Sequence, residues 1–276
     1  VPEYLAREMP KRGGVFLQTE SELAGINMVL GASAAGARVM TSSSGPGLCL
    51  MLEAISSMAL TRLPAVIVDV VSGPGMGDLA PAQEDWKLSG NGAYKIPILL
   101  PGNVQELANM VFEAFDIADQ YSTPVLVLAD GMLGQMMEPV EFKDQGENAK
   151  IDKPWALTGH QFKRPHNVVN SLYLKPADLE RLVKERFERY ETIKKTEQRA
   201  EEYLVDDADI VVVAYGASSR VARSAVNAAR AEGIKAGLIR PITLWPFPTD
   251  ALQRAAQHVK KFLAVEMSMG QMVDDV

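Results

Sequence analysis

The segment Pro-Ala-Val-Ile-Val-Asp-Val-Val, residues 64–71, decides the fold class of this chain. It is a nearly continuous apolar run, which is typical of a strand buried on both faces of a sheet. Pro-Val-Leu-Val-Leu-Ala (124–129) is a second such run, and between the two, residues 103–121 place apolar side chains at helical spacing. Buried strands that alternate with amphipathic helices predict an α/β fold with a parallel sheet covered on both faces.

Further apolar runs extend this unit toward both ends and begin a second one. In the first unit the other predicted strands are 14–18, 38–42 and 96–100, and the other predicted helices are 20–36 and 47–61. In a second, smaller unit of three strands, the predicted strands are 208–215, 236–240 and 261–266, with helices near 218–231 and 249–258. The chain therefore divides into two α/β units.

A stretch of different character separates the two units. Residues 138–176 contain four prolines and no sustained period, and residues 177–204 have the spacing of one long helix with a solvated, charged face. We therefore expect a first domain at 1–140, a linker and connecting helix at 141–204, and a second domain at 205–276.

The composition argues against several classes of function. A net charge of −7 disfavours binding to nucleic acid or to an anionic membrane surface. No apolar run is long enough to span a bilayer and the first residues lack the pattern of a signal peptide, so we expect a cytoplasmic protein. One cysteine and three histidines cannot supply a cysteine-ligated iron–sulfur cluster or a zinc site. Cys49, which has apolar neighbours, is expected in the core.

The segment from Gln18 to Gly25 holds the first candidate functional residue, Glu22. Thr19 and Glu22 have the spacing of a capping box, in which the Glu22 carboxyl would only cap its own helix. Alternatively, the carboxyl points into the crevice at the carboxyl edge of the parallel sheet, where doubly wound folds bind ligands. The spacing leaves both possibilities open.

A second candidate segment follows the strand at 38–42 and opens the next helix. It directs hydroxyl groups and free N–H groups toward the same crevice. No lysine follows its glycines, so it is not a P-loop, and both a plain turn and a ligand-binding loop remain open. The glycine-rich loop 72–78 is similarly placed. The residues of the candidate segment are Thr41, Ser42, Ser43, Ser44, Gly45, Pro46 and Gly47.

These segments resemble a known family. The run from Gln18 to Gly47 is similar to the pyrimidine-binding domain of 2-oxoacid:ferredoxin oxidoreductases, and the similarity extends over nearly the whole chain. The run Arg240-Pro-Ile-Thr-Leu-Trp-Pro-Phe247 lies in a part similar to the C-terminal domain of transketolases. The runs that look most like the branched-chain, 3-methyl-2-oxobutanoate members are Leu128–Pro139, Arg164–Asn167, Asn170–Tyr173 and Val213–Ser218.

The resemblance implies a fold, a reaction and a role for Glu22. The fold is a thiamine-diphosphate pyrimidine-binding domain followed by a smaller transketolase C-terminal-like α/β domain. The reaction is the oxidative decarboxylation of a 2-oxoacid to acyl-CoA, CO2 and reduced ferredoxin, with coenzyme A as co-substrate. Glu22 matches the glutamate that contacts the aminopyrimidine ring of thiamine diphosphate, supported by residues 41–46. Donation to the ring requires a protonated carboxyl, which burial favours and a helix N-terminus opposes.

The resemblance also implies that the chain is one part of an enzyme. The family's diphosphate motif, Gly-Asp-Gly with a later Asn and a divalent metal, is broken at Gly77-Asp78-Leu79, so a partner subunit is expected to supply the diphosphate site and Mg2+. Iron–sulfur clusters are expected on ferredoxin-like or gamma-type subunits, with ferredoxin as acceptor and a dimer of heteromers as the assembly. No metal is expected on this chain.

Two departures from the family concern the substrate. The family's Tyr-Pro-Ile-Thr-Pro segment would lie upstream of Val1, and Ser72 stands where the family usually has an arginine. A guanidinium group is a natural partner for the carboxylate of an oxoacid. We therefore expect either a different mode of substrate binding or a further stretch of chain that supplies these groups.

Other functions compete with this interpretation. A subunit of an oxoacid dehydrogenase, which passes its acyl group to lipoamide, would share both domains, but the runs 132–139 and 164–173 argue against it. A nucleotide-binding or electron-transfer subunit would use Val211–Gly216 as the strand before a dinucleotide loop, but that loop lacks the second and third glycines. A non-catalytic scaffold is a third alternative.

Overall fold

The structure is a computed structural model, and it describes residues 2–73, 80–90, 94–142 and 151–276. Its first sheet has the strand order β1-β2-β4-β3-β8. The first four of these strands are parallel to one another, as the continuous apolar runs predict. They are β1 (Met40–Ser43), β2 (Ala65–Val71), β4 (Pro124–Asp130) and β3 (Ile98–Leu99).

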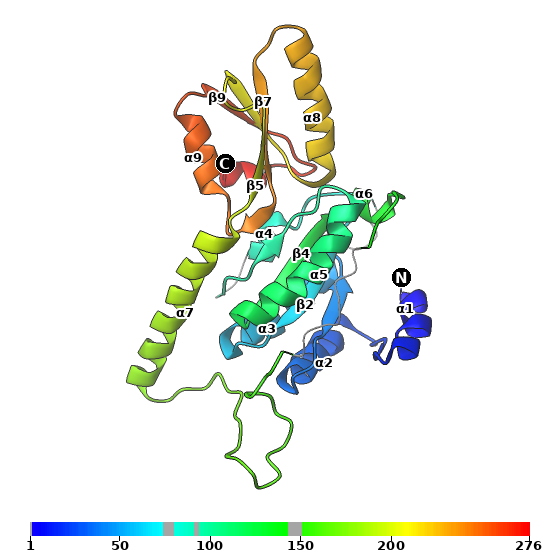
Figure 1. The fold of residues 1–276 in the computed structure, drawn as a ribbon, viewed down its shortest axis with the longest axis vertical. Coiled ribbons are helices and arrows are strands. Elements are labelled where there is room, and N and C mark those ends of the chain that lie inside the picture. The colour runs from blue at the N-terminus through cyan, green and yellow to red at the C-terminus, as the bar shows by residue number, and fades with distance from the viewer. Residues whose placement is uncertain (1, 74–79, 91–93, 143–150) are drawn as a thin grey trace.

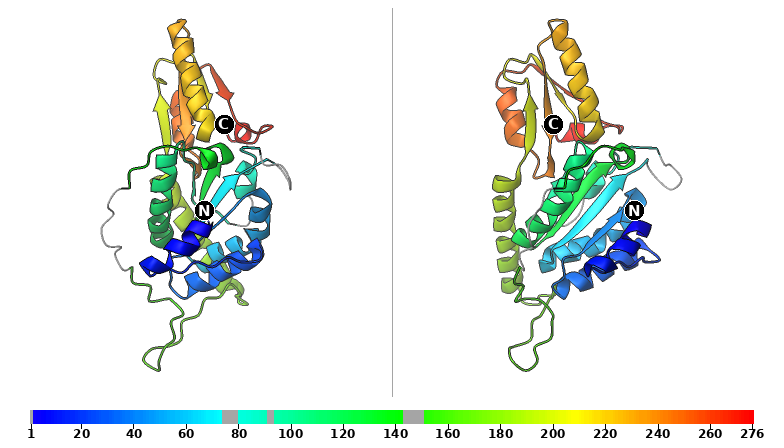
Figure 2. Two further views of the ribbon diagram at one scale, coloured as in Figure 1. Left: turned by 90° about the vertical axis from the view of Figure 1, so that its right-hand side faces the viewer. Right: turned by 45° about the vertical axis from the view of Figure 1, so that its right-hand side comes forward.

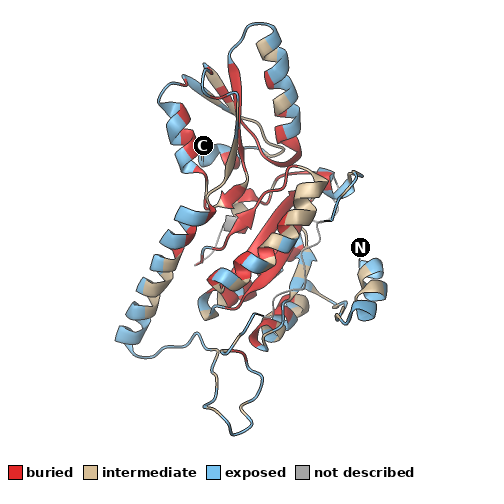
Figure 3. Ribbon diagram, in the orientation of Figure 1, coloured by how far each residue is buried: buried red, intermediate tan, exposed pale blue. Residues whose placement is uncertain are grey.

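Helices cover both faces of this sheet. In β2, Ile67 belongs to the core formed with α2 (Glu22–Ala34) and α3 (Gly45–Thr61). Val66, whose side chain points to the opposite face, belongs to the core formed with α5 (Val104–Tyr121). Strands β2 and β4 are buried along almost their whole length (Figure 3). The prediction of a doubly covered parallel sheet is confirmed.

The second unit is built on a four-stranded sheet of order β5-β7-β6-β9. Its strands are β5 (Ala200–Tyr203), β7 (Ala236–Pro241), β6 (Ile210–Val213) and β9 (Lys261–Ala264). Its helices are α8 (Gly216–Ala231) and α9 (Thr249–Ala256), and α7 (Pro176–Glu197) leads into it from the linker. Figures 1 and 2 show the two units stacked end to end, with α7 along one side.

The two units share hydrogen bonds. Strand β8 (Thr243–Trp245), from the C-terminal part of the chain, pairs antiparallel with β3 of the first sheet. The buried side chain of Gln83 donates from Nε2 to the carbonyl of Tyr215 at 3.0 Å and accepts at Oε1 from Ser218 Oγ at 3.0 Å. The Asp130 carboxyl, at the end of β4, accepts the backbone N–H of Ala217 at 2.7 Å. These buried contacts fix the second unit on the carboxyl edge of the first sheet.

Two predicted elements and the predicted number of strands in the second sheet are wrong. Residues 14–18 form no strand, and Val15 is 87% exposed there, since no neighbouring strand pairs with this segment among the described residues. The helix predicted at 177–204 ends at Glu197, because residues 200–203 form β5 antiparallel to β7. The second sheet therefore has four strands instead of three.

The remaining elements are short. They are α1 (Pro2–Glu8), α4 (Trp86–Gly90), α6 (Gly131–Gln135) and the 3-10 turns Pro10–Arg12 and Met272–Asp274. The described part of the linker, residues 138–142 and 151–175, contains no helix or strand. Among the described helices, none combines the length and apolar character needed to cross a membrane.

Candidate functional site

The helix that carries Glu22 is not capped in the way the sequence suggests. Ser21 is the N-cap residue of α2, and its Oγ accepts from the backbone N–H of Ala24 at 3.3 Å. The Thr19 hydroxyl donates instead to the carbonyl of Ser21 at 3.0 Å. The capping box of Thr19 and Glu22 is therefore wrong, because Ser21 lies two residues closer to the helix than Thr19 and takes the capping role. The Glu22 carboxyl is left for another use.

Glu22 lies against the first turn of α3, beside Gly47. A Cβ atom added to Gly47 would lie 2.7 Å from Glu22 Cγ, 3.0 Å from Glu22 Oε1 and 2.0 Å from Ser43 Oγ. Only a residue without a side chain leaves room for Glu22 and Ser43 at this point. The fold thus brings together the two segments singled out in the sequence, 18–25 and 41–47, at the carboxyl end of β1.

This close approach gives a testable expectation for stability. Gly47→Ala should lower the free energy of unfolding of the isolated chain by about 1–3 kcal/mol, because the new methyl group overlaps Ser43 and Glu22. Gly31→Ala is the matched control in α2, since a Cβ there meets no atom within 4 Å; it should raise the stability by about 0.5–1 kcal/mol. Chemical denaturation measures both. Equal effects of the two substitutions would contradict the proximity of Glu22 and Ser43 to Gly47.

Not all candidate residues of the 41–47 segment lie close to Glu22. Thr41 and Ser42 lie within β1, and Pro46 is exposed in the first turn of α3. Ser44 occupies the N-cap position of α3, but its hydroxyl caps no backbone N–H. Of the predicted residues, Ser43 therefore lies beside Glu22, with Ser44 and Gly45 next to it in the chain.

The backbone N–H of Gly45 is already occupied, and its acceptor was missed by the sequence reasoning. It donates to the carboxyl group of Asp85, which lies just before α4. Asp85 in turn lies against Asp69 of β2, which is fully buried. Among the described residues no N–H or O–H group donates to either Asp69 oxygen, so the partner of the Asp69 carboxyl is the Asp85 carboxyl.

The two carboxyl groups can hydrogen bond only if one of them is protonated. Burial, followed by the nearby Asp85 charge, raises the pKa of Asp69 to about 8. Burial also raises the pKa of Asp85, against the opposing effect of hydrogen bonds from Asp69 and from the Gly45 N–H. We infer that Asp69 holds the proton and Asp85 the negative charge. Through the Gly45 N–H, Asp85 holds the N-terminus of α3, two residues before Gly47.

The surface beside the site carries an exposed stripe on α3. Its members are Pro46, Cys49, Leu50 and Glu53, which recur at helical spacing on one side. The prediction that Cys49 lies in the core is wrong: α3 turns Leu48 and Met51 inward and leaves Cys49 and Leu50 exposed, the latter by 53%.

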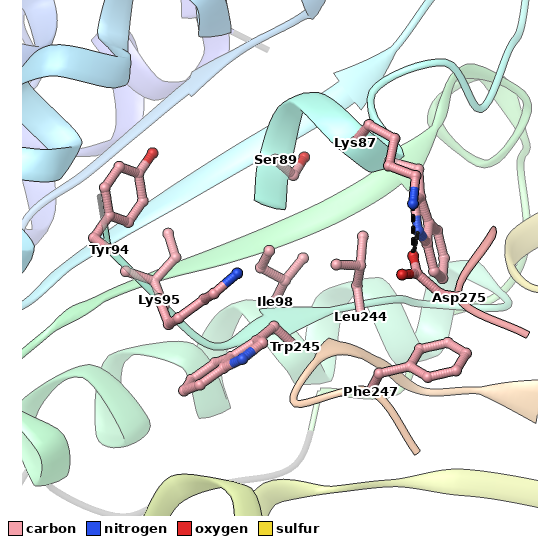
Figure 4. Close-up of a pocket in the computed structure, with 11 residues that line it drawn as sticks. Lys87, Ser89, Tyr94, Lys95, Ile98, Leu244, Trp245, Phe247 and Asp275 are labelled. Carbon is pink, nitrogen blue, oxygen red and sulfur yellow. Dashed lines mark hydrogen bonds and ion pairs between the residues drawn. The ribbon is translucent and has the colours of Figure 1, made fainter. Parts of the chain in front are cut away.

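A pocket of about 260 Å3 lies between α4, β3 and the segment that follows β8 (Figure 4). Asp275 accepts hydrogen bonds there from Trp86 Nε1 at 2.6 Å and from Lys87 Nζ at 3.3 Å, and Trp245 and Phe247 also line it. None of the predicted cofactor residues belongs to this pocket. Within the described ranges there is also no group of three His, Cys, Asp or Glu side chains that could hold a metal ion. Residues 74–79, which include Gly77-Asp78-Leu79, lie outside these ranges.

Comparison with known proteins identifies the family of the chain. Residues 1–205 match the family described as "Pyruvate flavodoxin/ferredoxin oxidoreductase, thiamine diP-bdg", and residues 208–276 match "Pyruvate:ferredoxin oxidoreductase core domain II". The chain belongs to the 2-oxoacid:ferredoxin oxidoreductase family. This confirms the resemblance that the runs 18–47 and 240–247 suggest.

Two relatives within this family differ in their sequence identity to this chain. The chain is 50% identical to "Ketoisovalerate oxidoreductase subunit VorB" of Methanothermobacter thermautotrophicus, over 98% of this chain and 78% of that protein. It is 34% identical to "2-oxoglutarate synthase subunit KorA" of Methanothermobacter marburgensis, over 100% of this chain and 82% of that protein. Both relatives are named as subunits.

Two solved structures share the fold. The 2-oxoglutarate:ferredoxin oxidoreductase of Magnetococcus marinus, solved with 2-oxoglutarate, coenzyme A and succinyl-CoA bound, superposes with a TM-score of 0.84 and 26% identity over 99% of this chain. This chain spans 53% of the length of that one. A split-gene transketolase superposes with a TM-score of 0.60 at 18% identity over 95% of this chain and 67% of that one, which shows the fold alone. The predicted pairing of a pyrimidine-binding domain with a transketolase-like domain is confirmed.

Proposed function

We propose that this chain is the subunit of a 2-oxoacid:ferredoxin oxidoreductase that presents Glu22 to the aminopyrimidine ring of thiamine diphosphate. The assembled enzyme would oxidatively decarboxylate a branched-chain 2-oxoacid to acyl-CoA, CO2 and reduced ferredoxin. The observation that carries the proposal is the position of the Glu22 carboxyl, which takes no part in capping α2 and lies beside Gly47 at the carboxyl edge of the sheet. Ligands of doubly wound folds bind at this edge.

The residues present fit one half of the cofactor. The absence of a side chain at Gly47 lets Glu22 and Ser43 lie together, and the exposed Glu22 carboxyl can donate to a ring nitrogen. A diphosphate group fits less well, because the Gly45 N–H at the N-terminus of α3 already donates to Asp85. The ring therefore belongs beside Glu22, and a partner subunit would hold the diphosphate and Mg2+. When bound, thiamine diphosphate supplies the electron sink that decarboxylation of a 2-oxoacid requires.

The task of Glu22 is to hold a proton at its carboxyl oxygen, facing the ring nitrogen. Its place in the first turn of α2 favours the ionised form. Removal of water from around the carboxyl favours the protonated form. Because Glu22 is exposed in this chain, the covering groups would come from the cofactor and from a partner subunit.

The exposed stripe on α3 supports such a partner. Leu50 lies about one turn after Gly47 on the same side of the helix, so an apolar surface continues from the Glu22 site. Gly31, in the neighbouring helix α2, has open space around it and admits close approach of another backbone. We propose that the diphosphate-binding subunit packs here. Iron–sulfur clusters would lie on further ferredoxin-like or gamma-type subunits, with ferredoxin as acceptor, in a cytoplasmic dimer of heteromers.

The substrate can be tested on the purified complex. Identity is 50% to a ketoisovalerate oxidoreductase subunit, 34% to a 2-oxoglutarate synthase subunit and 29% to a pyruvate synthase subunit, which favours a branched-chain 2-oxoacid. We expect kcat/KM for 2-oxoisovalerate to exceed that for pyruvate by about 10–200-fold, because a pocket shaped for the larger apolar group loses about 1–3 kcal/mol with a smaller one. Reduction of a viologen dye measures the rates. A higher kcat/KM for 2-oxoglutarate or pyruvate would overturn the assignment.

A further inference from the structure

A larger pocket, of about 580 Å3, lies far from the Glu22 site. It is bounded by the C-terminal end of α3, by residues 168–173 of the linker and by α7, the long helix along the side of the molecule in Figure 1. Helix α3 has 17 residues, and at 1.5 Å per residue its two ends are about 25 Å apart. Gly47 is at one end and Arg62 follows the other, so the pocket opens at the opposite edge of the sheet from the cofactor.

Four arginines line this pocket: Arg62, Arg181, Arg186 and Arg189. Glu185 is the one acidic residue among the described residues of the lining, and it is shared by Arg62 at 3.2 Å and Arg181 at 2.6 Å. The lining thus carries an excess of positive charge in a chain whose net charge is −7.

Arg186 and Arg189 lie on the same side of α7 and have no acidic partner among the described residues. The Nε atom of each is buried from solvent and donates to no acceptor there. Burial, and then the nearby charge of Arg62, with a smaller effect of Arg186, lowers the pKa of Arg189. A guanidinium Nε–H group that is buried without an acceptor, on a side chain with no acidic partner, destabilises a fold. An anion that binds both would remove this cost.

We propose that this pocket binds a phosphorylated small molecule of nucleotide size. Two neighbouring guanidinium groups match the oxygens of a phosphate, which they can hold with paired hydrogen bonds. Trp155 and Tyr173 line the same pocket and offer aromatic surfaces for a ring system. A volume of about 580 Å3 lies within the range of ligand pockets.

The test uses both the purified complex and the isolated full chain, with ADP, pyrophosphate and adenosine as probes. ADP and pyrophosphate at millimolar concentration should raise the Tm of both samples, and adenosine alone should not, because the phosphate makes the charged contacts. Arg186→Gln and Arg189→Gln should each weaken ADP binding at least tenfold by calorimetry. Arg254→Gln, an exposed arginine paired with Glu202, is the matched control and should leave the affinity unchanged.

A stability readout separates loss of binding from loss of fold. Arg189→Met should keep or raise the Tm without ligand, since it removes an unpaired charge, and should abolish the shift caused by ADP. A shift with adenosine equal to that with ADP would overturn the proposal, as would the absence of any shift in both samples. Binding by the isolated chain that disappears in the complex would also overturn it, because a partner subunit then fills the pocket.

Discussion

Glu22→Gln in the assembled enzyme is expected to lower turnover by about 10²–10⁴-fold while thiamine diphosphate stays bound. The amide keeps the size of the side chain and its hydrogen-bonding capacity, but it cannot hold and return a proton at the oxygen that faces the ring. A positioned acid or base contributes a factor of this size. The measurements are oxoacid-dependent reduction of a viologen dye and the cofactor content of the purified complex.

Glu20→Gln is the matched control for this experiment. Glu20 is an exposed glutamate two residues earlier, in the same connection between residue 18 and α2. It should retain turnover within about twofold of the unaltered enzyme, because surface substitutions have small effects. If Glu22→Gln behaves like Glu20→Gln, the proton of this enzyme is held elsewhere and the proposed role of Glu22 is wrong.

The second large effect concerns stability as a function of pH. Burial raises the pKa of Asp69 to about 8, whereas in the unfolded chain it has its ordinary value near 4. Between these values the folded chain binds one more proton than the unfolded chain, so the free energy of unfolding falls as pH rises. The slope from this group is at most about 1.4 kcal/mol per pH unit, and its contribution levels off above pH 8.

Asp69→Asn should remove this dependence. The asparagine amide can still donate to Asp85 but does not titrate in this range. The free energy of unfolding of the variant should therefore exceed that of the unaltered chain by about 1–3 kcal/mol between pH 5.5 and 8. Chemical denaturation at several pH values measures the difference. Asp206→Asn, at an exposed position, is the control, and its free energy of unfolding should depend on pH in the same way as that of the unaltered chain. If the free energy of unfolding of Asp69→Asn depended on pH in the same way as that of the unaltered chain, Asp69 would be ionised in the folded protein.

Local patterns predicted most of the first unit. Strands β2 and β4 and helices α3 and α5 form within two residues of their predicted bounds, because burial on both faces and helical spacing leave a direct record in the sequence. Glu22 was singled out from its position between an apolar run and a helix, and its role at the cofactor stays a prediction. Ser21 decided how that helix is capped, and spacing alone did not rank it above Thr19.

Long-range contacts account for what the sequence did not reveal. The pairing of Asp69 with Asp85 depends on how the segment before α4 returns to β2, which no local pattern records. An aspartate inside a nearly continuous apolar strand was nevertheless a signal, since a buried carboxyl needs a partner. Cys49 was misplaced because an apolar run on a helix has an outer side as well as an inner one.

Strand β8 has a consequence for how the chain is made. Ile98 of β3 pairs with Trp245, and the backbone N–H of Leu100 donates to the carbonyl of Ile242 at 2.8 Å. During synthesis, the edge of the first sheet at β3 therefore stays unpaired until residues 242–245 have left the ribosome. An open strand edge of this kind can pair with other chains, so nascent copies truncated before residue 240 should be prone to aggregate.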